Sequence, residues 1–285
     1  MKLNKPNADL YIPDGMEEQG ALARTTHLAI AAHQDDIELM AYHGAAECFG
    51  REDRWFAGVV VTNGAGSPRA GIYARYTDEQ MQQVRLREQR KAAHVGEYGC
   101  QFQLGYSSGE VKKAPAEAVT GDLFAILQAT RPEVVYLHNL ADKHETHVAV
   151  SLRALAALRR LSAPLRPAKV YGCEVWRDLD WLADEDKQCL PVSQRSNIAA
   201  ALVGVFDSQV SGGKRYDLAA EGRRLANATY YASHATDVET ALTFAMDLTP
   251  LVHDPALAPA EYVRGYIDKF KIDVETRLSQ LQTGS

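Results

Sequence analysis

Short apolar runs alternate with longer amphipathic segments along most of this chain, and that alternation narrows the possible folds more than any other feature. A run of about four to eight apolar residues between turn signals is typical of a buried strand, and apolar residues at three- and four-residue spacing are typical of a helix. Repeated strand–helix units form parallel sheets that are covered by helices. The pattern therefore predicts an α/β fold with a mostly parallel sheet.

The positions of the expected elements follow from this pattern. Strands are expected at residues 27–33, 55–62, 100–104, 134–138 and 169–175, and helices at 36–48, 77–98, 122–130 and 147–161. A further helix pair, at 197–206 and 214–231, is expected to complete the cover of the sheet. From residue 235 onward, prolines predict a loop that is followed by a terminal helix near 261–281.

The composition is that of an ordinary globular protein. The chain has 285 residues, of which 46% are hydrophobic and 24% charged, and no linker-like stretch divides it, so a single domain is expected over 1–285. The net charge of −6 argues against nucleic acid as a partner. No segment approaches the ~20 apolar residues of a membrane span. The four scattered cysteines predict reduced thiols and a cytoplasmic location.

A histidine and two aspartates lie where the first expected strand gives way to a helix. His33 and Asp36 are three residues apart, so their side chains can meet on one metal ion. Asp35 and Asp36 cannot point the same way, because neighbours on a helix diverge by ~100°. One carboxylate can therefore bind a metal while the other handles a proton. The alternative is that His33 only ends a strand and one aspartate caps the helix.

A second group of polar residues follows the fourth expected strand and opens a helix. His144 and His147 are three residues apart and share a face, and Asp142 lies just before them. Such a histidine pair alone most often describes a solvated helix start. The carboxyl ends of parallel strands meet at one edge of a sheet, however, and ligands bind there. The two groups are therefore expected to converge on one site.

Together the two groups resemble the motifs of the PIG-L/LmbE-like deacetylase family, named for N-acetylglucosaminyl-phosphatidylinositol de-N-acetylase. The first family motif, A-H-P-D-D-x-E, is similar to residues 32–38, with Gln34 in place of proline. The second, roughly D-x-H-x-D-H, is similar to residues 142–147, with Thr146 in place of an aspartate. The resemblance implies a Rossmann-like three-layer sandwich. Fainter similarity extends along most of the chain and includes Asn63-Gly64, Arg85-x-x-Glu88 and Asp207-Ser208-Gln209.

The resemblance also implies a role for each matched residue. It assigns His33, Asp36 and His147 as zinc ligands, Asp35 as the general base, and a protonated His144 as the group that assists the transition state. Three protein ligands leave zinc an open position for water, whose pKa falls to ~7. The implied activity is hydrolysis of the N-acetyl group of a small N-acetylglucosamine-type sugar or glycoside. A homo-oligomer is a further expectation from the family.

Two departures from the family pattern affect these expectations. Gln34 lacks the fixed φ of proline, which would loosen the turn beside His33 without removing a ligand. Thr146 removes a carboxylate that would keep His144 charged. Asp142 is expected to take over that role, unless it caps the following helix.

Some assignments stay open from the sequence. Asn63, Arg85, Asp142 and Trp176 are the residues expected to contact substrate. Arg85 could equally form a surface ion pair, and Trp176 could belong to the core. His138 ends a strand close to the site and could line it or serve a structural role. Two other functions also remain: a metal-dependent amidase of another sugar or thiol conjugate, and a sugar-binding protein without turnover. The metal could be a divalent ion other than zinc.

Overall fold

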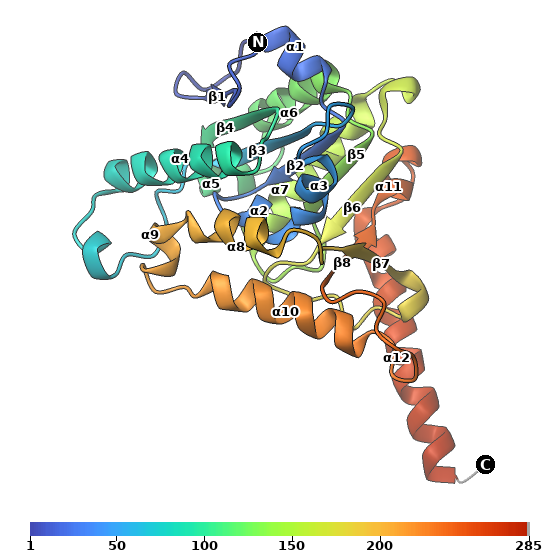
Figure 1. Ribbon diagram of the computed structural model, residues 1–285. Coiled ribbons are helices and arrows are strands. Elements are labelled where there is room, and N and C mark those ends of the chain that lie inside the picture. Colours follow the sequence, from blue (N-terminus) through green and yellow to red (C-terminus); the bar gives the residue numbers. More distant parts are fainter. Residues whose placement is uncertain (284–285) are drawn as a thin grey trace.

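The computed structural model describes residues 1–283 and is built around one eight-stranded sheet (Figure 1). The strand order across the sheet is β1-β4-β3-β2-β5-β6-β8-β7. β1 and β8 run opposite to the other six strands, so the sheet is mostly parallel, as predicted. The strands are β1 (Asp9–Tyr11), β2 (His27–Ala31), β3 (Phe56–Thr62), β4 (Cys100–Tyr106), β5 (Val134–His138), β6 (Lys169–Cys173), β7 (Lys187–Pro191) and β8 (Leu242–Asp247).

Helices cover both faces of this sheet, which gives three layers. The helices are α1 (Glu18–Ala23), α2 (Asp36–Met40), α3 (Tyr42–Cys48), α4 (Asp78–Val95), α5 (Ser108–Lys112), α6 (Glu117–Thr130), α7 (Glu145–Arg160), α8 (Ser196–Gly204), α9 (Asp207–Val210), α10 (Tyr216–Tyr230), α11 (Thr249–His253) and α12 (Pro259–Thr283). Short 3-10 turns lie at Gly71–Tyr73, Ala163–Leu165 and Asp184–Asp186. None of the helices within residues 1–283 is both long and apolar enough to span a membrane.

The central strands are apolar throughout because both of their faces are buried. In β2, Leu28 and Ile30 pack into one core with α6 and α7, whereas Ala29 and Ala31 pack into the other with α2 and α3. All five residues of β2 are buried, so its sequence lacks the polar alternation of a half-exposed strand. The prediction of an α/β fold, with a mostly parallel sheet covered by helices, is therefore confirmed.

Three strands were not expected from the sequence. β8 lies where a loop was predicted after residue 235, and that prediction is wrong over Leu242–Asp247. β8 is almost wholly buried, so it lacks alternation, and its six residues are too few to stand out from a buried helix segment. β7 ends in Pro191, a residue that argues against a strand, and it pairs only with β8 at the sheet edge. β1 has only three residues.

The expected helix over 36–48 is divided in two. Ala41 has φ −116° and separates α2 from α3. The other predicted strands and helices are present with small changes at their ends. The carboxyl ends of β2, β3, β5 and β6 lie at one edge of the sheet, and the loops that follow them carry the polar residues considered next.

Candidate active site

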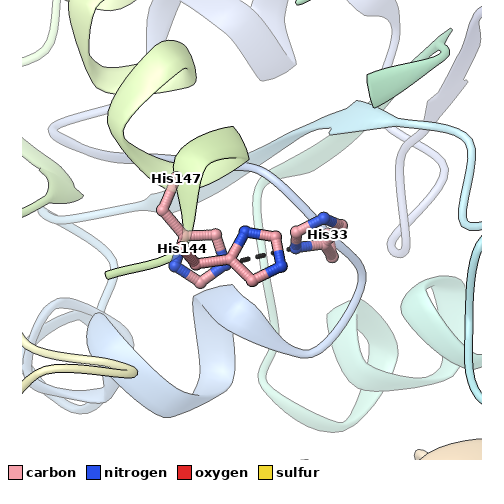
Figure 2. A group of neighbouring side chains, drawn as sticks. All are labelled: His33, His144 and His147. Carbon is pink, nitrogen blue, oxygen red and sulfur yellow. Dashed lines mark hydrogen bonds between the residues drawn. The ribbon is translucent and has the colours of Figure 1, made fainter. Parts of the chain in front are cut away.

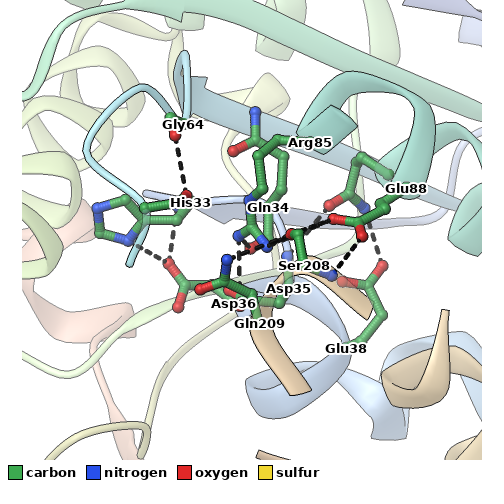
Figure 3. Close-up of polar contacts among 12 residues, drawn as sticks. His33, Gln34, Asp35, Asp36, Glu38, Gly64, Arg85, Glu88, Ser208 and Gln209 are labelled. Atoms are coloured by element: carbon green, nitrogen blue, oxygen red, sulfur yellow. Dashed lines mark hydrogen bonds and ion pairs between the residues drawn. The ribbon is translucent and has the colours of Figure 1, made fainter. Parts of the chain in front are cut away.

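His33, Asp36 and His147 bring three ligand-type atoms together at this edge. Figure 2 shows His33 beside His147, and Figure 3 shows His33 beside Asp36. His33 Nδ1 lies 3.0 Å from Asp36 Oδ2. His147 Nε2 lies 3.2 Å from Asp36 Oδ2 and 3.2 Å from His33 Nδ1. Two ligands of a tetrahedral zinc ion are about 3.4 Å apart when each bond is about 2.1 Å. The residues present therefore fit a bound divalent cation, and nitrogen and carboxylate donors suit zinc.

Local structure fixes the first two members of this group. β2 ends two residues before His33, whose backbone N–H donates to Asp36 Oδ2 at 2.7 Å. Asp36 is the first residue of α2, where the helix dipole favours a negative charge. His147 comes from the first turn of α7, which follows β5. The predicted convergence of the two sequence groups on one place is what the structure contains.

Asp142 lies behind His147 and not behind the ring of His144. Its Oδ2 is 3.2 Å from His147 Nδ1 and also accepts the backbone N–H of Trp176 at 3.2 Å. Its Oδ1 accepts the backbone N–H of His144 at 3.0 Å. The Asp142 side chain is fully buried, so it orients His147 and has no free oxygen for a substrate. The sequence-based expectations that Asp142 charges His144 or contacts substrate are not met by this geometry.

Two carboxylates set the charge of His147. Burial alone would lower the pKa of His147, but Asp36 and Asp142 outweigh it and raise this pKa to about 9. Burial would raise the pKa of Asp36, yet His147, His33 and His138 hold it well below its usual value. Metal ligands must be deprotonated, so a cation binding here would release the proton of His147.

Asp35 faces different neighbours from Asp36. Its backbone has φ 93°, a conformation that non-glycine residues rarely adopt, and this turns its carboxylate toward Arg85. Asp35 Oδ2 lies 3.3 Å from Arg85 Nη2 (Figure 3). Burial, with a smaller contribution from the negative charge of Asp36, raises the pKa of Asp35 to about 7. The positive charge of Arg85 opposes this rise. Asp35 therefore suits a group that takes up and releases a proton near neutral pH.

Arg85 is a buried residue of α4, so the alternative of a surface ion pair is wrong. Only 2% of it is exposed, and it donates to the backbone carbonyl of Gln34 and to Ser208 Oγ. Glu88, one helical turn later, lies 3.7 Å away and accepts from Ser208 at 2.6 Å. These contacts hold Arg85 beside Asp35.

No carboxylate within residues 1–283 bonds to the ring of His144. His144 stacks on His147 with ring centroids 4.4 Å apart, and its Nδ1 is buried without a partner. Burial, followed by the charges of His147 and His33, lowers the pKa of His144 to about 4. The expected protonated His144 therefore has no support in these surroundings. Its ring nitrogen is nevertheless within 4.8 Å of those of His33 and His147.

His138 lies next to the site in a structural role. Its Nε2 accepts the backbone N–H of Ala32 at 2.9 Å, and its ring stacks on His147 at 3.8 Å. The side chain of His138 offers a ligand-type atom within 4.8 Å of those of Asp36 and His147. The lone pair of His138 Nε2, however, already accepts the Ala32 hydrogen bond. Burial keeps the pKa of His138 well below its usual value.

A cavity of about 380 Å³, here called the polar cavity, opens in front of these residues. Of the expected substrate contacts, Asn63, Arg85 and Trp176 line it, and Asp142 does not. Gly64, in the same loop as Asn63, has φ 74° and passes so close to Gln34 and Arg85 that a Cβ would collide with both. The other lining residues include Ser67, Ser108, Gln209, Lys214 and Tyr216, which were not predicted as contacts.

Gln34 compensates for the missing proline with side-chain contacts. Its Nε2 donates to the carbonyl of Thr62 at 3.1 Å and to Gln103 Oε1 at 3.2 Å. The turn after β2 is thereby tied to β3 and β4. The loose turn expected at Gln34 is not what the structure contains.

Comparison with known proteins places these features in a family. Residues 28–158 match the profile of the PIG-L family, described as GlcNAc-PI de-N-acetylase. No sequence among curated proteins matches the chain. This segment runs from β2 to α7 and carries both the His33–Asp36 group and the Asp142–His147 group.

Solved structures with the same fold include enzymes of different chemistry. The N,N'-diacetylchitobiose deacetylase of Pyrococcus horikoshii superposes with a TM-score of 0.63 at 12% identity, over 81% of this chain and 86% of that chain. The 4-carboxy-2-hydroxymuconate hydratase GalB of Pseudomonas putida gives 0.59 at 16% identity, over 79% and 96%. The conserved protein TT1542 of Thermus thermophilus gives 0.59 at 20% identity, over 78% and 94%. The chain thus contains a PIG-L family domain, which spans residues 28–158.

Proposed function

We propose that this protein is a zinc-dependent hydrolase that removes the N-acetyl group from an N-acetylglucosamine-type amino sugar or glycoside. The observation that carries the proposal is the close triangle of His33 Nδ1, Asp36 Oδ2 and His147 Nε2. Asp35 lines the polar cavity together with His33 and Asp36. The match of residues 28–158 to the PIG-L de-N-acetylase profile supports this activity over others, and the fold is compatible with it because a diacetylchitobiose deacetylase shares it.

His33, Asp36 and His147 would hold the zinc ion. When bound, zinc lowers the pKa of water to ~7 and polarises an amide carbonyl. Asp142 keeps His147 oriented through its Nδ1. The donor set would also accept other divalent ions, so the choice of zinc is part of the proposal.

Asp35 would act as the general base. A water molecule would lose a proton to Asp35 while the water oxygen bonds to the carbonyl carbon of the amide. The C–N bond would then break, and the amine nitrogen would take up a proton. Arg85 fixes the Asp35 carboxylate for this task. A neutral His144 can still donate one N–H to the carbonyl oxygen as that oxygen gains charge, which is how it would assist the transition state.

The sugar would occupy the polar cavity. Asn63, Ser67 and Arg85 offer polar groups to sugar hydroxyls, and the face of Trp176 can stack on a pyranose ring. A cytoplasmic location and a homo-oligomeric state stay predictions from the sequence.

Metal content and acetate release together test this function. The purified protein should hold about one zinc ion per chain and release acetate from at least one of N-acetylglucosamine, its glycosides and diacetylchitobiose. Chelation should abolish the release and added zinc should restore it. Release from N-acyl thiol conjugates alone would favour the other amidase, and binding of sugars without metal or turnover would favour the binding protein.

A further inference from the structure

A second cavity lies directly beside the polar cavity. This α10 cavity, of about 230 Å³, lies between α10, the end of α2 and the segment that follows β6. Trp176 and Tyr216 line both cavities and so form the wall between them. Their rings meet edge to face with centroids 6.2 Å apart. Leu39 also lines the α10 cavity, and its backbone N–H donates to the carbonyl of Asp35 at 3.1 Å. The α10 cavity therefore begins one helical turn from the proposed catalytic carboxylate.

The two cavities differ in the chemistry of their walls. The polar cavity has hydroxyl, amide and charged groups, whereas Leu39, Val175, Ala219 and Ala220 give the α10 cavity mainly alkyl surface. An amide of an amino sugar has the same asymmetry. Its nitrogen carries a ring with hydroxyl groups, and its carbonyl carbon carries a hydrocarbon chain.

The charged residues that line the α10 cavity already have partners within the protein. Glu174 accepts the backbone N–H groups of Phe244 at 3.0 Å and Leu179 at 3.1 Å. Arg224 donates to the backbone carbonyls of Glu38 and Leu39, at 2.7 and 3.2 Å. Arg223 donates to the carbonyl of Val175. Each of these three side chains would therefore keep at least one hydrogen bond within the protein beside an apolar occupant, although Arg224 Nε has no partner among the described residues.

From these observations we infer that the α10 cavity receives the acyl group of the substrate and that the protein hydrolyses N-acyl amino sugars with chains longer than acetyl. The inference rests on the proposed function, because it places the scissile amide beside His33, Asp36 and His147. The sugar then lies in the polar cavity, and the chain enters the α10 cavity when the side chains of Trp176 and Tyr216, which separate the two cavities, move apart. Hydrolysis yields the free fatty acid and the same amino sugar.

Three substrates that share one product make this testable. N-acetyl-, N-butanoyl- and N-hexanoylglucosamine all release glucosamine, so one assay of free amine compares them. Each buried methylene is worth a few-fold in binding, and hexanoyl has four more carbons than acetyl. The kcat/KM for the hexanoyl substrate should therefore exceed that for the acetyl substrate by on the order of a hundredfold.

Narrowing the cavity should reverse that preference. Ala220→Leu adds a branched side chain to the wall and should lower the hexanoyl-to-acetyl ratio of kcat/KM by about tenfold. Ala200→Leu is the matched control, since Ala200 lies on α8 and lines a neighbouring cavity that Ala220 also borders, but not the α10 cavity. It should change the ratio by no more than about twofold. Ala219→Leu, at an exposed helical position, serves as a second probe should Ala220→Leu not fold.

The outcomes separate this inference from the proposed function. Hydrolysis of the acetyl substrate with little or none of the hexanoyl substrate overturns the inference alone. A chain-length preference that neither Ala220→Leu nor Ala219→Leu alters also overturns it. If no substrate is hydrolysed, the proposed function fails. Calorimetric titration of the protein with the hexanoyl and acetyl compounds then tests whether the α10 cavity binds an acyl chain. Equal affinity for the hexanoyl and acetyl compounds would end the case for an acyl pocket.

Discussion

Asp35 and Asp36 are adjacent in sequence, yet the backbone gives them opposite surroundings. Asp36 enters α2 and lies among three histidines, which keep its carboxylate charged. Asp35, with φ 93°, is turned instead toward Arg85 in a buried place where the pKa rises to about 7. A residue in such a strained conformation persists only where neighbours hold it. The proposed division between a metal ligand and a proton carrier thus follows from one unusual backbone angle.

The first prediction tests that division. Asp35→Asn should keep zinc bound, because Asp35 is outside the triangle of ligand atoms, and should lower kcat by roughly 10² to 10⁴, as expected on losing a general base. Zinc per chain and acetate release are the measurements. His147→Ala is the comparison, and it should lose the metal itself. Equal zinc loss in both variants would show that Asp35 is a ligand and not a base.

A second residue-scale prediction concerns Asp142. Asp142→Asn removes the negative charge from His147 Nδ1, and losing such a partner typically weakens metal affinity by about 10- to 100-fold. Titration of zinc against a competing chelator measures this. At saturating zinc, KM for sugar should be unchanged, since Asp142 does not line the polar cavity. Asp178→Asn, on an exposed position of the nearby loop, is the control. A raised KM at full zinc occupancy would instead indicate substrate contact.

At the scale of elements, the sequence predicted those helices and strands whose formation depends on the local pattern of apolar residues. The five parallel strands read as apolar runs because both of their faces are buried, and their shared direction brought His33 and His147 to one edge. β8 was missed because five of its six residues are buried, so that its sequence shows no alternation. Lys214 and Tyr216 were missed as cavity residues for another reason. They reach the site only through the packing of α10 against it, which no local pattern encodes.

The third prediction concerns the link between β2, β3 and β4 through Gln34. Gln34→Ala leaves Gln103 Oε1 and the carbonyl of Thr62 without this donor in a buried place, which should lower the free energy of unfolding by about 1–3 kcal/mol. Urea denaturation measures it. Gln83→Ala, exposed on α4, should stay within about 0.5 kcal/mol of the unmodified protein.

A double-variant cycle isolates the contact itself. Gln34→Ala combined with Gln103→Ala should lose less free energy than the two single changes added together, because each single change already breaks their hydrogen bond. Strict additivity would mean that the amide pair does not stabilise the turn after β2.

At the scale of the whole molecule, the two edges of the sheet carry different kinds of histidine. The carboxyl edge holds the histidines of the proposed site. His27 lies at the opposite end of β2, away from the proposed site, and is only 6% exposed. Burial, followed by the positive charges of His43 and Arg54, lowers the pKa of His27 to about 4. The free energy of unfolding therefore depends on pH through His27 at this opposite edge of the sheet.

The sign of that coupling sets the fourth prediction. An unfolded histidine has a pKa near 6.5, so between about pH 6.5 and 4 the unfolded chain binds a proton at His27 that the folded protein does not. The free energy of unfolding should fall as the pH drops through this window and gain nothing further from His27 below it. At about 1.4 kcal/mol per pKa unit, His27 accounts for up to about 3 kcal/mol.

Substituting His27 should flatten this dependence. His27→Gln removes the titrating group, so the loss of unfolding free energy between pH 7 and pH 4.5 should be smaller than in the unmodified protein by about 2 kcal/mol. Denaturant unfolding at matched metal content measures both. His43, His138 and His144, whose pKa values are also lowered, contribute to the acid sensitivity that remains, as do carboxylates with lowered pKa values such as Asp36. His234→Gln, at an exposed position, should keep the original slope. If the unfolding free energy of His27→Gln fell with pH as steeply as that of the unmodified protein, the acid sensitivity of the fold would not come from His27.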